Sequence, residues 1–232
     1  MKEASQAINQ IQYVSNFQDL VSTPFQGDIN AICWTRSLSG DFAEIVRKLA
    51  PKENLCELEV EDLLALALSD EGKLARDILI QDMKLLETHG ASPILNIIKC
   101  YETEDGDAFF STDVYSFHVD RSPIPADTFL CTYYGASSDI LANADAEQKV
   151  LVPEIREALK KIFDGSAEDF ESFLVEHFFD LHYRAKTNAV PINLGVGQLW
   201  RLAVDHPEST VLPCIHRAPK EKDGELRLLL IC

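Results

Sequence analysis

Apolar residues recur at helical spacing through the first third of the chain. The clearest case covers residues 71–89, where one face of a predicted helix is lined by Ala75, Leu79, Met83 and Leu86. Shorter helices are expected over about 41–49, after a capping segment at residues 39–41, and over 60–68. Together these segments predict a mainly helical N-terminal layer over residues 1–92.

The apolar period changes from helical to alternating at about residue 94. Runs rich in β-branched and aromatic residues predict strands over 94–101, 108–118, 128–134, 197–204, 211–216 and 226–231. In the third of these strands, alternation places Thr128, Leu130, Thr132 and Tyr134 on one face, opposite Phe129, Cys131 and Tyr133. Such a series of strands favours a mostly antiparallel sandwich or jelly roll.

A second helical pattern interrupts these strands between about residues 145 and 187. Pro153 suits the first turn of a helix, and a break at Gly165-Ser166 separates that helix from a second amphipathic segment over 170–181. Because strands resume afterwards, the pair is expected to be an inserted helical hairpin. The sequence therefore predicts one α+β domain over 1–232, with the helical layer packed on a β core at 93–232.

The charge balance of the chain is strongly acidic. Among 232 residues, 38 are Asp or Glu and 21 are Lys or Arg, which gives a formal net charge of -17. Such a protein repels phosphate backbones and anionic membrane surfaces, so neither nucleic acid nor a membrane is an expected partner. A local basic pocket inside this acidic surface is still compatible with the composition.

The cysteines and the hydropathy pattern predict a cytoplasmic location. Six cysteines occur without a Cys-x-x-Cys pair, which favours reduced thiols over a disulfide scaffold. The first six residues lack the apolar core of a signal peptide. No apolar run approaches the roughly 18 residues that a membrane span needs.

Three residues form a candidate metal site. His118 and Asp120 are two positions apart on a predicted strand, so their side chains should point the same way. A third ligand must come from another strand, and His216 follows the apolar segment that best supplies one. Two imidazoles and one carboxylate leave roughly three open positions on a six-coordinate ferrous ion, enough for a chelating cosubstrate and dioxygen.

An arginine near the C-terminus is a candidate for binding that cosubstrate. Arg227 is flanked by Leu226 and by the apolar residues 228–231. A guanidinium in such a run is costly to bury unless it pairs with an anion. Residues 220–224 look like a hairpin loop, which would put His216 and Arg227 on paired strands. The planar fork of arginine donors suits a carboxylate, and the distal carboxylate of 2-oxoglutarate is the expected partner.

At these residues the chain resembles the Fe(II)/2-oxoglutarate-dependent dioxygenases. The resemblance covers about 94–232 and implies a double-stranded β-helix core, also called a jelly-roll or cupin-like core. It implies Fe(II) on His118, Asp120 and His216, with 2-oxoglutarate on Arg227. Because a carboxylate at Asp120 fills a position that halogenases leave for chloride, hydroxylation is the expected reaction.

Further contacts are expected around this site. Thr132 and Tyr134 are candidates to hydrogen-bond the cosubstrate, and Arg217 and Arg121 are candidates to contact a substrate. The substrate itself is open among small molecules, amino acids and protein side chains.

A narrower resemblance is to an uncharacterised bacterial family, domain of unknown function 1826. It depends on the segments Cys33-Trp34-Thr35-Arg36, Phe117-His118-Val119-Asp120, Cys131-Thr132-Tyr133 and His216-Arg217-Ala218-Pro219. It spans nearly the whole chain but implies no substrate. The gap between Asp120 and His216 is longer than in many compact dioxygenases, and the helical insertion would account for it.

Plainer interpretations of the same residues stay open. His118 could be a satisfied strand histidine, Asp120 a turn residue before Pro123, and Arg227 the partner of Glu225. His206 competes with His216 as third ligand, although Asp205-His206-Pro207 looks like a turn.

Other chemistries are less well supported by the sequence. Cys214 and His216 could form a thiol–base pair or part of a zinc site, although Cys is more often a small buried apolar residue. His177 and His182 are expected on a helix surface or at the rim of the core. Two alternative functions remain: a cupin-like protein that binds zinc, nickel or manganese without 2-oxoglutarate, and a non-catalytic ligand-binding module.

Overall fold

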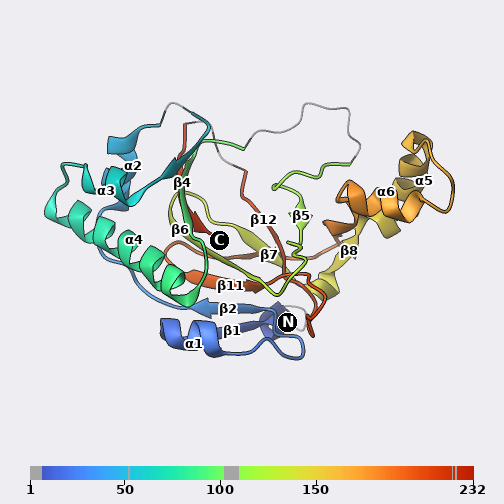
Figure 1. Cartoon of the computed structure of the whole chain (residues 1–232), viewed down its shortest axis with the longest axis horizontal. Helices are drawn as coiled ribbons and strands as arrows, with labels where there is room; N and C mark the ends of the chain where they lie inside the picture. The colour runs from blue at the N-terminus through green and yellow to red at the C-terminus, as the bar shows by residue number, and fades with distance from the viewer. Residues whose placement is uncertain (1–6, 52, 102–109, 221, 223) are drawn as a thin grey trace.

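The computed structural model describes residues 7–51, 53–101, 110–220, 222 and 224–232. Two mainly antiparallel sheets pack face to face, helices cover the outer face of the larger sheet, and a helical pair extends beyond the smaller one (Figure 1). This arrangement confirms the predicted α+β class. The double-stranded β-helix stays a prediction. The start of the predicted strand at 108–118 and the first six residues lie outside the described part of the chain.

The larger sheet has seven strands in the order β1-β2-β11-β6-β13-β4-β3. Their bounds are β1 (Ile11–Val14), β2 (Ala31–Trp34), β3 (Leu55–Leu58), β4 (Ile94–Ile98), β6 (Asp127–Tyr134), β11 (Leu199–Ala203) and β13 (Arg227–Ile231). Every neighbouring pair is antiparallel except β1 and β2. The strand β13 lies between β4 and β6, and its side chains alternate between two core clusters: Leu228 and Leu230 pack on the helix side, whereas Leu229 packs between the sheets.

The smaller sheet has six antiparallel strands in the order β10-β7-β12-β5-β9-β8. Their bounds are β5 (Phe117–His118), β7 (Asp139–Leu141), β8 (Ala146–Gln148), β9 (His182–Ala185), β10 (Ile192–Asn193) and β12 (Ile215–Arg217). Leu130 and Leu229 of the larger sheet pack with Ile140 of the smaller one in a shared apolar core. The inner faces of the two sheets therefore meet.

The helices are α1 (Phe17–Ser22), α2 (Phe42–Leu49), α3 (Val60–Leu64), α4 (Asp70–His89), α5 (Pro153–Ile162) and α6 (Phe170–Glu176). The long helix α4 begins where Ser69 accepts a hydrogen bond from the Gly72 amide and ends at Gly90, whose φ is 97°. Its predicted apolar face packs on β6 residues such as Cys131 and Tyr133. The predictions for α2 and α4 are confirmed. Among the described residues, no helix is long and apolar enough to cross a membrane.

A buried ion pair joins α4 to the larger sheet. Arg36, two residues after β2, donates from Nη1 and Nη2 to the Asp82 carboxylate at 2.7 and 2.5 Å. The Tyr133 hydroxyl donates to the same carboxylate at 2.6 Å. Arg36 belongs to one of the segments behind the narrower family resemblance, and here its contacts hold the helical layer to the sheet.

The prediction of a mainly helical N-terminal layer is only partly right. Residues 1–92 also supply β1, β2 and β3, three strands of four residues each. In β2, Ala31, Ile32 and Cys33 are all buried, so no alternation of apolar and polar residues marks the strand. Tertiary pairing with β11, rather than local pattern, places it in the sheet.

The predicted pairing of the His216 and Arg227 strands is wrong. His216 belongs to β12 in the smaller sheet, whereas Arg227 begins β13 in the larger one. The segment between them is therefore a crossover between sheets and not a hairpin loop. Within residues 110–118, only Phe117 and His118 form a strand.

Two helices, α5 and α6, lie within the range 145–187 that the sequence predicts to be a helical insertion. The helices α5 and α6 lie away from the sheets in Figure 1 and pack around their own cluster, which includes Leu159, Phe170 and Leu174. Two strands within the predicted insertion, β8 and β9, pair antiparallel at one edge of the smaller sheet. The insertion thus leaves and re-enters the fold at adjacent strands.

Candidate metal centre

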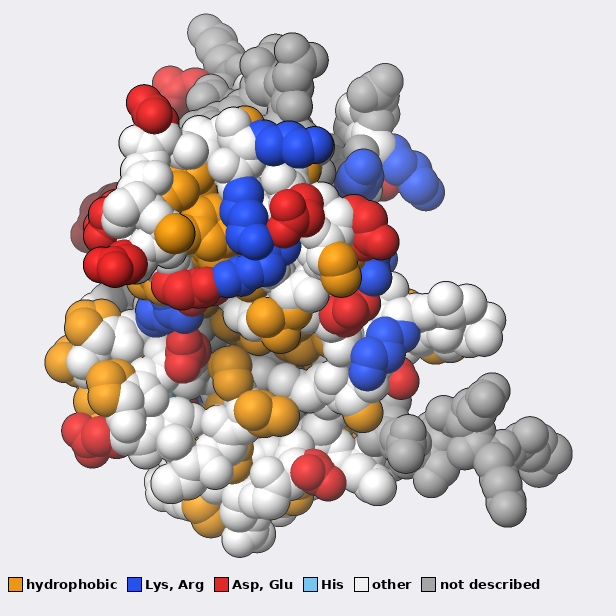
Figure 2. Space-filling model, turned by 90° about the vertical axis from the view of Figure 1, so that its right-hand side faces the viewer, with side chains coloured by type: hydrophobic (Ala, Val, Ile, Leu, Met, Phe, Trp, Pro, Cys, Tyr) orange, Lys and Arg blue, Asp and Glu red, His pale blue; other side chains and the backbone are white. Residues whose placement is uncertain are grey.

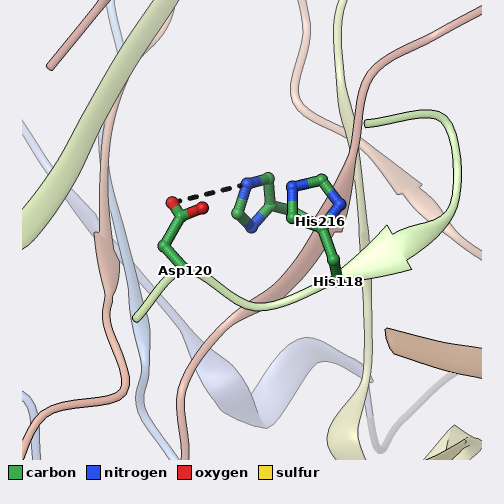
Figure 3. Close-up of side chains that lie close together, drawn as sticks. All are labelled: His118, Asp120 and His216. Carbon is green, nitrogen blue, oxygen red and sulfur yellow. Dashed lines mark ion pairs between the residues drawn. The ribbon is translucent and has the colours of Figure 1, made fainter. Parts of the chain in front are cut away.

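Strand register brings the candidate ligands together. His216 on β12 lies directly opposite His118 on β5, and their ring centroids are 4.5 Å apart. Asp120 follows two residues after His118, just beyond the end of β5. The ligand atoms of the three side chains all lie within 4.8 Å of one another. Figure 3 shows the carboxylate of Asp120 turned toward the His216 ring.

Backbone carbonyl groups fix the orientation of both imidazoles. Nδ1 of His118 lies 2.8 Å from the Ser116 carbonyl oxygen, and Nδ1 of His216 lies 3.2 Å from that of Cys214. Because a carbonyl oxygen only accepts hydrogen bonds, each Nδ1 carries the proton in the neutral ring, and each Nε2 keeps its lone pair. Nε2 of His216 lies 3.6 Å from Oδ2 of Asp120. This tautomer is the one that a metal site needs.

Asp120 is positioned by two neighbouring segments. The hydroxyl of Thr128, on the inner face of β6, donates to Oδ2 of Asp120 at 2.5 Å. The amide of Asp205 donates to the backbone carbonyl of Asp120 at 2.9 Å. The carboxylate is thereby held from the larger sheet, while the two imidazoles come from the smaller one.

The protonation states suit a cation. Burial, together with the neighbouring His216, lowers the pKa of His118 to about 4, so that ring is neutral near pH 7. Burial alone would raise the pKa of the Asp120 carboxyl, but His216 and the Thr128 hydroxyl outweigh it and lower that pKa. The cluster therefore offers the neutral imidazole of His118 and the negative carboxylate of Asp120.

A cavity of about 770 Å³ adjoins this cluster. His118 and Asp120 are part of its wall, together with Arg121, Phe178 and His182. A volume of this size accommodates a small-molecule ligand or one side chain of a larger partner. The cluster is therefore reachable from one side by a ligand in the cavity.

Arg227 is buried between the sheets. It shares the inner face of β13 with Leu229 and is 1% exposed. Its Nη2 donates to the Thr132 hydroxyl at 3.2 Å and to the Ser138 hydroxyl at 2.8 Å. Arg227 and Thr132, both candidates to contact the cosubstrate, are thus neighbours in the structure. Ser138, which precedes β7, was not predicted.

Tyr134 does not share the face of Thr132 as alternation predicted. A bulge shifts the register of β13 against β6, so Thr132 lies opposite Leu229 but Tyr134 lies opposite Leu228. Leu229 packs between the sheets, whereas Leu228 packs beneath the helices. At the bulge, β6 has one more residue than β13. Tyr134 is therefore turned to the other face from Thr132 and Arg227, and it is 37% exposed.

The two candidate substrate arginines have different positions. Arg121 lines the cavity, where Nη2 contacts Asp180 at 2.5 Å and Nε contacts Asp205 at 2.8 Å. Arg217 is on the opposite face of β12 from His216, as predicted, and pairs with Asp139 at 2.9 Å. The structure does not bring Arg217 to the cluster.

The competing ligands lie outside the cluster. His206 lines the cavity, and its Nδ1 accepts a hydrogen bond from the Glu208 amide at 3.2 Å. Cys214 is buried in the core between the sheets, and burial raises the pKa of its thiol, so a thiolate is disfavoured.

His182 was wrongly predicted to lie on a helix surface or core rim. It begins β9, is 4% exposed, and lies opposite His118 in the sheet. Three histidines, 216, 118 and 182, therefore stand in a row on adjacent strands. In the sequence, the tyrosine and arginine after His182 indicate a short strand. The helical pattern that precedes them made this strand hard to predict.

Replacing Thr128 by valine should weaken metal binding roughly 10- to 100-fold, because Asp120 loses the hydroxyl that orients its carboxylate. The measurement is a calorimetric titration of the metal-free protein with Zn²⁺ or Fe²⁺. Thr128→Ser keeps the hydroxyl and should bind metal like the wild type. An unchanged affinity for Thr128→Val would show that this hydrogen bond does not support the cluster.

Comparisons of the chain with models of protein families, with curated proteins and with solved structures found no match. The functional argument therefore depends on the geometry of the cluster and its surroundings.

Proposed function

We propose that the protein is a non-haem Fe(II)- and 2-oxoglutarate-dependent oxygenase, and specifically a hydroxylase. The observation that carries the proposal is the convergence of His118, Asp120 and His216, whose ligand atoms lie within 4.8 Å of one another. Two imidazoles and one carboxylate on one side of a ferrous ion are typical of this class of oxygenase. The proposal includes the double-stranded β-helix, and two facing sheets are compatible with it.

The donor set fits a divalent cation. Both Nε2 atoms carry lone pairs because each Nδ1 donates to a backbone carbonyl. The Asp120 carboxylate adds one negative charge and is oriented by Thr128. The adjoining cavity gives the open side of such an ion access to other ligands.

With 2-oxoglutarate and dioxygen, bound Fe(II) supplies the oxidation of a C–H bond, coupled to conversion of 2-oxoglutarate to succinate and carbon dioxide. In this chain, His118, Asp120 and His216 would hold the ion. Asp120 would occupy the position where a halogenase binds chloride, which favours hydroxylation.

Arg227 is the proposed anchor for the distal carboxylate of 2-oxoglutarate. It presents a planar guanidinium inside the protein, where a charge-assisted hydrogen bond to a carboxylate is strong. The hydroxyls of Thr132 and Ser138 accept hydrogen bonds from Arg227 and hold the guanidinium in place. Each hydroxyl can also donate its proton to a carboxylate of the cosubstrate.

Arg227→Lys should lower the affinity for 2-oxoglutarate about 10- to 100-fold, because lysine keeps the charge but loses the fork of donors. The measurement is anaerobic titration of the Fe(II)-loaded protein with 2-oxoglutarate, followed by a weak visible charge-transfer band. Arg217→Lys, whose arginine pairs with Asp139 outside the cluster, is the matched control and should titrate like the wild type. Absence of the band in the wild type would exclude 2-oxoglutarate as the cosubstrate.

One observation favours a second candidate function, a metalloprotein that does not use 2-oxoglutarate. His182 adds a third imidazole to the row, with its ring centroid 5.8 Å from that of His118. Nitrogen-rich surroundings suit zinc, nickel or copper as well as iron. Metal analysis of the purified protein, combined with the titration above, separates the two candidates.

A further inference from the structure

An exposed aromatic residue stands at the mouth of the cavity in a strained conformation. Phe178, just after α6, has φ 58° and ψ 14°, in the left-handed region, and is 60% exposed. Bulky residues rarely adopt this conformation, because their Cβ crowds the backbone, and such outliers concentrate at functional sites. Glycine would fit this position without strain. Neither the backbone conformation nor burial therefore favours a phenylalanine here.

The neighbouring aromatic residues do have a packing role. Phe170 belongs to the core of the helical insertion, and Phe173 and Phe179 pack against that core. Phe178 is not part of this cluster and instead lines the cavity that His118 and Asp120 also line. Its ring is thus available to a molecule that enters the cavity.

A buried histidine forms part of the same cavity wall. His182 lines it and is 4% exposed, and its Nδ1 has no hydrogen-bond partner among the described residues. A buried polar atom is normally paired, so an orphaned one on a cavity wall points to a ligand as its partner. The edge of Phe110, at a centroid distance of 6.1 Å, and the His118 ring bound this imidazole on two sides.

The charges around the cavity disfavour an anion. Asp113, Asp120 and Asp205 all lie on its wall. The arginine on the wall, Arg121, is already paired with Asp180 and Asp205. On the surface seen in Figure 2, Lys and Arg side chains likewise lie next to Asp and Glu. In the metal-free protein, Asp113, Asp120, Asp180 and Asp205 outnumber the neighbouring basic side chains, Arg121 and Lys149, so an anionic substrate would meet a net negative charge.

We infer that this cavity binds a substrate with a flat apolar group and no negative charge, which stacks on Phe178 and hydrogen-bonds His182 through a neutral or cationic polar group. The remaining wall supports an apolar body, since it includes Val114, Val119, Pro123, Leu181 and Pro207. The inference rests on the proposed function in one respect, because it takes the His118–Asp120–His216 cluster as the reacting centre for the molecule held there.

The test uses three probes of similar shape and different charge: 2-phenylethanol, 2-phenylethylammonium and phenylacetate. Their binding to the metal-free protein is measured by ligand-observed NMR, so that no probe can bind through a metal. We expect the alcohol and the ammonium to bind at least about fivefold more tightly than phenylacetate, on the scale of one aromatic contact or one modest charge interaction. Equal or tighter binding of phenylacetate would overturn the charge argument, and failure of all three probes to bind would overturn the site.

Variants locate the bound probe. Phe178→Ala should weaken binding of 2-phenylethanol about fivefold, whereas Ile162→Ala, which removes an exposed apolar residue of α5, should leave it unchanged. Phe178→Gly should unfold at the same or a higher temperature than the wild type, because it relieves the strained conformation. Unchanged binding by Phe178→Ala would overturn the role of this ring.

His182 is tested with a pair of variants. His182→Leu should weaken 2-phenylethanol binding about fivefold, and His182→Asn, which retains hydrogen-bonding groups, should restore part of it. Equal binding by both variants and the wild type would overturn the role of His182. Metal titration of the same proteins is the independent readout. If the wild type binds no metal, the proposed function is refuted, but the result with the probes still stands.

Discussion

Replacement of His216 by alanine is expected to lower metal affinity by more than about 100-fold. Loss of an outer hydrogen-bond partner already costs about 10- to 100-fold, and removal of a ligand should cost more. His216 contributes one of the two Nε2 atoms, and its ring is 4.5 Å from that of His118. The measurement is calorimetric titration of metal-free wild type and variant with Zn²⁺ and with Fe²⁺ under anaerobic conditions.

The matched control is His206→Ala. His206 lines the same cavity but lies outside the cluster, so its loss should leave the metal affinity within about twofold of the wild type. Circular dichroism should show that both variants are folded. If His216→Ala binds metal as tightly as the wild type, or if the wild type binds none, the cluster is not a metal centre.

Replacement of Asp82 by alanine should reduce the free energy of unfolding by about 3–5 kcal/mol. Asp82 is 2% exposed and accepts hydrogen bonds from two nitrogens of Arg36 and from the Tyr133 hydroxyl. Its removal leaves a buried guanidinium without its counter-charge. Because domains are typically stable by about 5–15 kcal/mol, the loss is large, and urea denaturation followed by tryptophan fluorescence will measure it.

Asp77→Ala on the same helix is the control for this change. The Asp77 side chain is 63% exposed and pairs with Arg76 at 2.9 Å, so its replacement should change stability by at most about 1 kcal/mol. The double variant Arg36→Met with Asp82→Leu should recover much of the loss, since apolar residues can replace a buried pair. A loss below about 1 kcal/mol for Asp82→Ala would show that water reaches Arg36 in the variant.

The long periodic elements could be predicted from the sequence, and the short ones could not. The helix α4 repeats its apolar face over 20 residues and carries recognisable caps, so its pattern is clear. The strand β5 has only two residues and takes its place from pairing with β9 and β12. No local pattern of two residues distinguishes a strand from a loop.

The three clustered ligands were predictable, but their surroundings were not. Spacing identifies His118 and Asp120, because residues two apart in extended chain point the same way. The separate sheets of His216 and Arg227, and the bulge that turns Tyr134 away from Thr132, depend on long-range pairing. His182 was missed because its role follows from lying opposite His118, 64 positions earlier in the chain by their numbers.

The way in which the helical insertion with α5 and α6 is attached has a consequence for protein engineering and for the divergence of related sequences. The insertion is joined through β8 and β9, at the far edge of the smaller sheet, and its last residues include Phe178. The helices α5 and α6 belong to neither β5 nor β12, so we expect that they can be exchanged while the strands that carry His118 and His216 keep their pairing. Grafting a different insertion is therefore expected to change the cavity wall at Phe178 while β5 and β12, which carry His118 and His216, stay in place.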